Sequence, residues 1–214
     1  MVSSAIINTW LLTMHGSGLG IVKNGTLAVE NETIVYAGPS CGFDPSNADS
    51  IIDGTNHVTM PGLVNTHFHS GSTLLRGGAQ DMPEIEWMNR GVGPLGAHVN
   101  HDDSLIGSKL AVVEGLRSGT TTFAEYGANV ARLVENVYRP FGVRVVATES
   151  INEISSNRSH LKPSDLYEFD RLKGDSALKQ AEQLFENFRG EDLVSCMYGP
   201  QALDMMSLEL LTRI

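Results

Sequence analysis

The chain has 214 residues, of which 41% are apolar, a fraction that can build a hydrophobic core. Its 25 acidic and 15 basic residues give a formal net charge of −10 without a Lys/Arg cluster that could follow a phosphate backbone, so no nucleic-acid partner is expected. No apolar run approaches the roughly 20 residues of a membrane helix and no signal-peptide pattern is found, so we expect no membrane contact and a cytoplasmic location.

The first sixty residues predict a small β-meander. Frequent Gly and Asn residues separate short runs with strand-like alternation. The expected strands are residues 5–12, 26–30, 33–38 and 50–53. Such a piece is too small to bury much surface alone. We therefore expect residues 1–58 to be the N-terminal part of a composite β-sandwich domain.

After Met60-Pro61-Gly62 the pattern changes to strands that alternate with helices. The expected strands are residues 63–67, 120–125, 143–149 and 193–198. The expected helices are residues 102–117, 128–138, 176–188 and a last one from 207 onward. In the first helix, Ile106, Leu110 and Val113 share one face, and Asn100 or Asp102 can serve as N-cap. Residues 151–175 predict a long loop of the kind that shapes a pocket.

Repeated strand-then-helix order is typical of an α/β fold with parallel strands and crossover helices. Residues 59–214 contain about four such units, whereas a complete (β/α)8 TIM-type barrel needs eight. We expect the first half of a barrel, as a fragment of a longer protein or completed by another chain. An open four-unit sheet is the structural alternative.

His67 and His69 are the strongest chemical signal in the sequence. They follow an apolar strand two residues apart, so both imidazoles project to the same face at its carboxyl end. Imidazole nitrogens suit Zn²⁺ and Fe²⁺, and two such donors supply half of a catalytic metal site. Two histidines near a strand end can also simply form hydrogen bonds.

The sequence around this pair resembles the amidohydrolase superfamily, in its deaminase and chlorohydrolase branch. That branch includes cytosine, guanine and thioadenosine/S-adenosylhomocysteine deaminases and the triazine hydrolases. The resemblance covers nearly the whole chain. It rests on the segments MPGLVNTHFH (60–69), TLLRG (73–77), EW (86–87), RSGTTTFAE (117–125), FGVRVV (141–146) and GP (199–200).

The resemblance implies one divalent metal ion, Zn²⁺ or Fe²⁺, held by His67 and His69 together with a histidine from a fifth strand and an aspartate from an eighth. A metal-activated water would attack a ring carbon, and a glutamate near the fifth-strand histidine would transfer protons. No catalytic residue can be assigned within these 214 residues, so the chain alone is expected to be inactive. Residues 193–201 contain no lysine, which favours one metal ion over two.

Four further residues are candidates for substrate binding. Trp87 matches a position where relatives stack an aromatic ring on the substrate, although a core tryptophan is equally consistent with the sequence. Glu125 and Glu149 end strands and can face a ligand, or be solvated or paired with arginine at the rim. Gln201 follows Gly199-Pro200 and can both donate to and accept from a heterocycle.

Three departures from the thioadenosine deaminase pattern bear on the substrate. Gln201 stands where those enzymes have a histidine, Pro94-Leu95-Gly96 where they have a glutamate, and Thr148-Glu149 where they have an arginine. Together they argue against a nucleoside. The expected function is hydrolytic removal of an amino or chloro substituent from a compact N-heterocyclic small molecule.

Two other function classes compete with this hydrolase. The chain could be a non-catalytic half-barrel or one completed by a partner, and the unfinished barrel then predicts exposed apolar surface and association. An open α/β binding protein is disfavoured because the sequence has no Gly-rich phosphate loop. For the hydrolase we expect a homo-oligomer.

Overall fold

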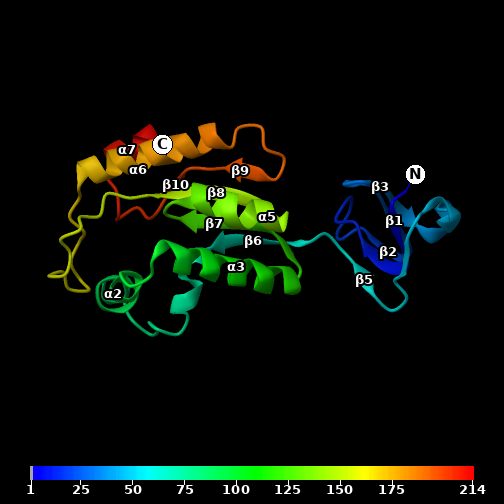
Figure 1. The fold of residues 1–214 in the computed structure, drawn as a ribbon, viewed down its shortest axis with the longest axis horizontal. Coiled ribbons are helices and arrows are strands. Elements are labelled where there is room, and N and C mark those ends of the chain that lie inside the picture. Colours follow the sequence, from blue (N-terminus) through cyan, green and yellow to red (C-terminus); the bar gives the residue numbers. More distant parts are fainter. Residues whose placement is uncertain (1) are drawn as a thin grey trace. The chain divides into compact units, whose positions relative to one another are not determined.

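The structure, a computed structural model that describes residues 2–214, divides into two compact units (Figure 1). The first unit ends at Gly62 and the second is Leu63–Ile214. Among the described residues, no helix is both long and apolar enough to cross a bilayer.

The first unit is a five-stranded sheet with strand order β3-β2-β1-β4 and with β5 also paired to β1. Its strands are β1 (Ser4–Leu12), β2 (Ile21–Glu30), β3 (Thr33–Pro39), β4 (Ile51–Asp53) and β5 (Val58–Thr59). The first three are antiparallel neighbours, and Asn31 makes the turn between β2 and β3 at φ 54°. Because β4 and β5 run parallel to β1, the sheet is not a simple meander.

The second unit is α/β with a parallel sheet, which confirms the fold class predicted from the alternating elements. The sheet contains β6 (Leu63–Phe68), β7 (Thr120–Gly127), β8 (Arg144–Ile151), β9 (Val194–Cys196) and β10 (Gly199–Pro200). β7 lies between β6 and β8, and both β9 and β10 pair with β8. The strand expected over 193–198 is shorter than predicted, since only β9 lies within that range. β10 is a separate short strand after it, and Gln201 directly follows β10.

Helices cover this sheet, as Figure 1 shows. The main ones are α3 (His101–Arg117), the continuous helical stretch α4 (Val130–Leu133), η5 (Val134–Tyr138) and α5 (Arg139–Phe141), then α6 (Arg171–Asn187) and α7 (Leu208–Arg213). Four short helical turns that the sequence did not predict connect β6 to α3. They are η3 (Ser70–Leu75), α1 (Glu84–Glu86), η4 (Trp87–Gly91) and α2 (Val92–Gly96). α6 begins at Arg171 rather than at residue 176, because Asp170 caps it by accepting from the Lys173 N–H.

The helix α3 shows where the sequence pattern succeeded and where it failed. Its N-cap is Asn100, one of the two residues expected there, and Asn100 forms a capping box with Asp103. The face that packs inward, however, carries Gly107, Ser108, Ala111 and Val112, whereas Ile106 is 59% exposed. Gly107 lies against Leu74 and Gly71 of η3, and farther along the helix Gly115 lies directly against the Phe123 ring of β7.

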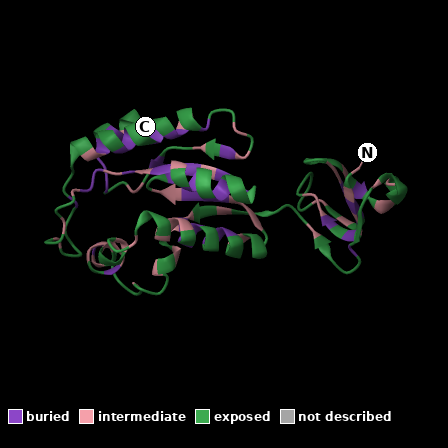
Figure 2. Cartoon of the chain, viewed as in Figure 1, coloured by how far each residue is buried: buried purple, intermediate pink, exposed green. Residues whose placement is uncertain are grey.

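The main core lies between the sheet and the helices and is visible as the buried residues of β7, β8 and the adjoining helix faces in Figure 2. Its largest fully buried members are Phe123 of β7 and Tyr138 of η5. Burial of these two aromatic side chains between the sheet and the helices contributes several kcal/mol. This core packs against β7, and the carboxyl end of β7 lies beside the histidine pair.

Candidate metal centre and adjoining pocket

His67 and His69 lie at the carboxyl end of β6 with their imidazoles directed at each other. The two Nε2 atoms are 2.9 Å apart, and the ring planes meet at 78°. The alternation of side chains along a strand puts both rings on one face, as the spacing in the sequence predicted. The arrangement brings two nitrogen donors to a single point.

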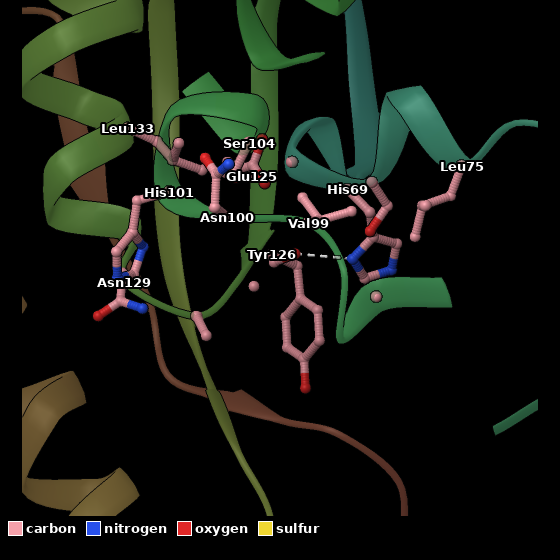
Figure 3. A pocket seen from close by; sticks show the side chains of 15 residues that line it. His69, Leu75, Val99, Asn100, His101, Ser104, Glu125, Tyr126, Asn129 and Leu133 are labelled. Atoms are coloured by element: carbon pink, nitrogen blue, oxygen red, sulfur yellow. Dashed lines mark hydrogen bonds between the residues drawn. The ribbon is translucent and has the colours of Figure 1, made fainter. Parts of the chain in front are cut away.

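A neighbouring carbonyl group fixes the chemical form of His69. Its Nδ1 lies 2.7 Å from the backbone oxygen of Tyr126, which can only accept a hydrogen bond, so Nδ1 carries the proton (Figure 3). In a neutral ring the lone pair then resides on Nε2, the atom that faces His67. Burial lowers the pKa of His69; the Tyr126 carbonyl opposes this shift and the charge of His67 adds to it. The neutral form is the one that binds a metal ion.

The pair fits a divalent metal ion. At a Zn–N distance of about 2.0–2.1 Å, one ion can contact two nitrogens separated by 2.9 Å. The His69 Nδ1–H bond to a backbone carbonyl is also the usual support of a histidine ligand. Within residues 2–214, no group of three or more His, Cys, Asp or Glu side chains is arranged to hold a metal ion. Two histidines alone would not complete the ligand set of a metal ion.

Glu125, a predicted substrate contact, is buried behind His69. Only 1% of its surface is exposed, and its carboxyl oxygens accept from the Ser70 backbone N–H at 3.2 and 3.3 Å. The Tyr138 hydroxyl donates to Oε2 of the same carboxyl group. Burial raises the pKa of Glu125 to about 7, although these donors oppose the shift. The carboxyl group is neither solvated nor paired with arginine, the alternatives weighed from sequence.

Glu149, the second predicted carboxylate, caps a helix. Its two oxygens accept from the backbone N–H groups of Asn129 at 2.7 Å and Val130 at 3.0 Å, at the start of α4. A carboxylate in this position satisfies otherwise unpaired amides and complements the helix dipole. Both oxygens are therefore occupied by the fold itself.

Gln201 lines a hollow of about 230 Å³ that is also lined by His67 and Tyr126. Its Oε1 accepts from Asn152 Nδ2 at 2.7 Å and from Ser150 Oγ at 3.3 Å. The Asn152 amide is itself oriented, because its Oδ1 accepts from the Ile154 backbone N–H at 3.2 Å. This chain of bonds leaves the Gln201 amide nitrogen as the group that can donate to a ligand.

Trp87 lies in η4 and is 38% exposed, and it lines neither the hollow beside His67 nor the one beside His69. Its helical segment is fastened to the loop that follows β8. Tyr167 donates to Glu84 Oε1 at 3.0 Å, and Asn89 donates to the Arg158 carbonyl at 2.9 Å. The loop expected over 151–175 therefore supports the segment that carries Trp87.

A second hollow, of about 310 Å³, is also lined by Tyr126, together with His69, Glu125 and His101 (Figure 3). His101, the first residue of α3, was not among the site residues expected from the sequence. Sequence reasoning also missed Tyr126, Ser70, Tyr138 and Asn152, whose importance depends on contacts across the sheet. The sequence gives no signal for such contacts.

Comparison with known protein families identifies the class to which the unit with the histidine pair belongs. The family model described as "Amidohydrolase family" matches residues 58–203. The chain belongs to the amidohydrolase family.

Known relatives agree with this assignment. A 5'-deoxyadenosine deaminase of Methanosarcina acetivorans is 32% identical over 219 residues, covering 100% of this chain and 46% of the relative. A zinc-bound adenosine deaminase structure from Xanthomonas campestris matches with a TM-score of 0.75 and 24% identity, over 93% of this chain and 43% of that one. A zinc complex of atrazine chlorohydrolase from Arthrobacter aurescens matches with a TM-score of 0.74 and 18% identity, over 97% and 48%. The structural matches show the shared fold, and the chain spans about half the length of these proteins.

Proposed function

We propose that this chain forms the first half of a metal-dependent hydrolase that removes an amino or chloro substituent from an N-heterocyclic small molecule. The observation that carries the proposal is the convergence of the His67 and His69 Nε2 atoms at 2.9 Å, with His69 held in its ligating tautomer by Tyr126. Membership of the amidohydrolase family and the deaminase and chlorohydrolase names among its relatives support the reaction class.

In this proposal His67 and His69 hold Zn²⁺ or Fe²⁺. The bound ion would lower the pKa of a water molecule and so supply the nucleophile. Burial favours the neutral form of His69, and the Tyr126 carbonyl orients the ring by accepting from Nδ1–H. The proton-transfer residue and the remaining ligands are assigned to polypeptide outside this chain, in the second half of the barrel.

Exposed apolar side chains support the half-barrel proposal. Leu63 and Val64 of the edge strand β6 are 48% and 60% exposed, and Ile106 and Leu110 of α3 are also exposed. Side chains of this kind are usually covered in a closed barrel. A second part of the barrel would cover them. The same observation supports the alternative in which a partner chain completes the barrel.

The substrate class is an amino- or chloro-substituted N-heterocycle. The relative from Methanosarcina acetivorans is named for a nucleoside, which weighs towards a ribosylated purine. Gln201, Pro94-Leu95-Gly96 and Thr148-Glu149 weigh against it, because they replace nucleoside-contacting residue types. We propose the compact heterocycle, and activity confined to ribosylated purines would overturn that choice.

The reaction is tested on the full-length protein with paired substrates, each amino heterocycle being offered as free base and as nucleoside alongside a chlorotriazine. Release of ammonia or chloride is measured before chelation, after chelation and after addition of Zn²⁺. We expect turnover of at least one compact heterocycle, its loss on chelation and its recovery with the metal. Turnover that persists in metal-free protein would contradict the proposed chemistry.

Gln201 should act as a hydrogen-bond donor to the ring. Gln201→Glu replaces the free amide nitrogen with an acceptor oxygen, so we expect KM to rise about tenfold or more, the effect of one lost hydrogen bond to a desolvated group. The expected change in kcat is smaller, because Gln201 does not belong to the metal pair. Steady-state kinetics measure the effect. The matched control is Gln183→Glu on the exposed surface of α6, and equal KM values for the two variants would refute the donor role.

A further inference from the structure

Two consecutive residues of β7 contact two consecutive residues of the metal-binding segment. The Tyr126 carbonyl accepts from the His69 ring, and the Glu125 carboxyl group accepts from the Ser70 backbone N–H. These contacts involve residues more than fifty positions apart in sequence. They form a clamp on the point where the chain leaves β6.

The sheet itself does not hold His69. The last paired residue of β6 is Phe68, opposite Glu125, and the register between Asn65 and Phe68 is irregular. His69 is the first residue beyond the strand and the N-cap of η3, with φ −122° and ψ 67°. Its backbone position therefore depends on what fixes the next amide, that of Ser70.

The group that fixes this amide is buried and braced. Glu125 is 1% exposed, and Ser70, Ser108 and Tyr138 are fully buried. The Tyr138 hydroxyl donates to the Glu125 carboxyl group, and Ser70 Oγ donates to Ser108 Oγ of α3 at 2.8 Å. A fully bonded buried network of this kind is rigid and specifies one arrangement. It ties the start of η3 to β7, α3 and η5 together.

We propose that Glu125 is a positioning residue for the metal ligand His69: braced by Tyr138, its acceptor oxygens hold the Ser70 amide and thereby keep His69 Nε2 directed at His67. The inference rests on the proposed function of the histidine pair. It replaces the substrate-contact role expected for Glu125 from sequence, because both of its oxygens are engaged inside the protein.

The test compares two substitutions of similar size in the full-length protein. Glu125→Gln keeps an oxygen that accepts from Ser70, whereas Glu125→Met fills the space without an acceptor. Zn²⁺ affinity is measured by competition with a chelator, and the absorption spectrum of Co²⁺-loaded protein reports the ligand geometry. We expect Glu125→Met to raise the Kd for Zn²⁺ about tenfold or more and to change the Co²⁺ spectrum, as loss of a ligand's support does. Glu125→Gln should stay within about threefold of wild type.

The control is Glu153→Met. Glu153 is also a buried carboxylate and accepts from the Ser207 backbone N–H, but it contacts neither histidine, so the Kd for Zn²⁺ should not change. If Glu125→Met does not fold, Tyr138→Phe decides the question, because it removes only the brace and should still weaken Zn²⁺ binding. Wild-type Kd in the folded Glu125→Met or, failing that, Tyr138→Phe protein would overturn the positioning role. Failure of the proposed metal site itself would give a different result. In that case Zn²⁺ binding to the wild-type protein would be unchanged by substitution of His67.

Discussion

Substituting alanine for either His67 or His69 should reduce turnover of the preferred heterocycle by more than about 100-fold. Loss of a residue that merely supports a metal ligand typically costs 10–100-fold, and these side chains are the proposed ligands themselves. The two Nε2 atoms lie 2.9 Å apart, so removing one leaves a single donor from this segment. The measurement is kcat/KM with excess Zn²⁺ present, together with circular dichroism to verify folding.

The control for this experiment is His98→Ala. His98 is exposed, precedes α3 and lines neither hollow beside the histidine pair, so its removal should leave kcat/KM within about twofold of wild type. A folded His67→Ala or His69→Ala protein with near-normal turnover would show that the pair does not bind a catalytic metal ion.

The second large effect concerns the pH dependence of stability at Glu125. Burial raises the pKa of this carboxyl group from 4.5 to about 7, so between these values the folded state binds a proton that the unfolded chain releases. The stabilising contribution is complete below the unfolded pKa and is lost as pH rises through the folded one. Between about pH 5 and about pH 8 the wild-type protein should lose roughly 2 to 3 kcal/mol of unfolding free energy at this site.

Glu125→Gln isolates this effect, because the carboxamide has nearly the same shape and does not titrate. Urea unfolding of wild type and variant across this pH range gives the difference in unfolding free energy. We expect the wild-type protein to become less stable relative to the variant by roughly 2 to 3 kcal/mol as pH rises. Parallel stability curves for the two proteins would mean that the carboxyl group titrates normally.

Local sequence signals predicted much of the second unit. The Asn100 cap, the apolar strand runs and the alternation of strands with helices identified α3, β7 and β8 to within a few residues. These features depend on neighbours in sequence, which is why they could be read directly. The inward face of α3 could not be predicted in this way. Gly107, Ser108 and Ala111 pack closely because they are small, not because they are hydrophobic.

The histidine pair could be predicted because two residues spaced i and i+2 at a strand end project their side chains to the same face. The supporting residues could not. Glu125 contacts Ser70 across 55 positions, and Gln201 is oriented by Asn152 across 49, so both roles arise only when separate strands meet. A carboxylate at a strand end is compatible with substrate binding, helix capping and ligand support, and tertiary contacts decide among these roles.

The central claim is that His67 and His69 bind a metal ion, and elemental analysis of the purified full-length protein tests it most directly. The measurement compares wild type with the His67→Ala/His69→Ala double variant and records the intact mass of each. We predict about one Zn²⁺ or Fe²⁺ per wild-type chain and less than about a tenth of that in the double variant. An active wild-type protein without metal, or a double variant that keeps its metal, would contradict the account.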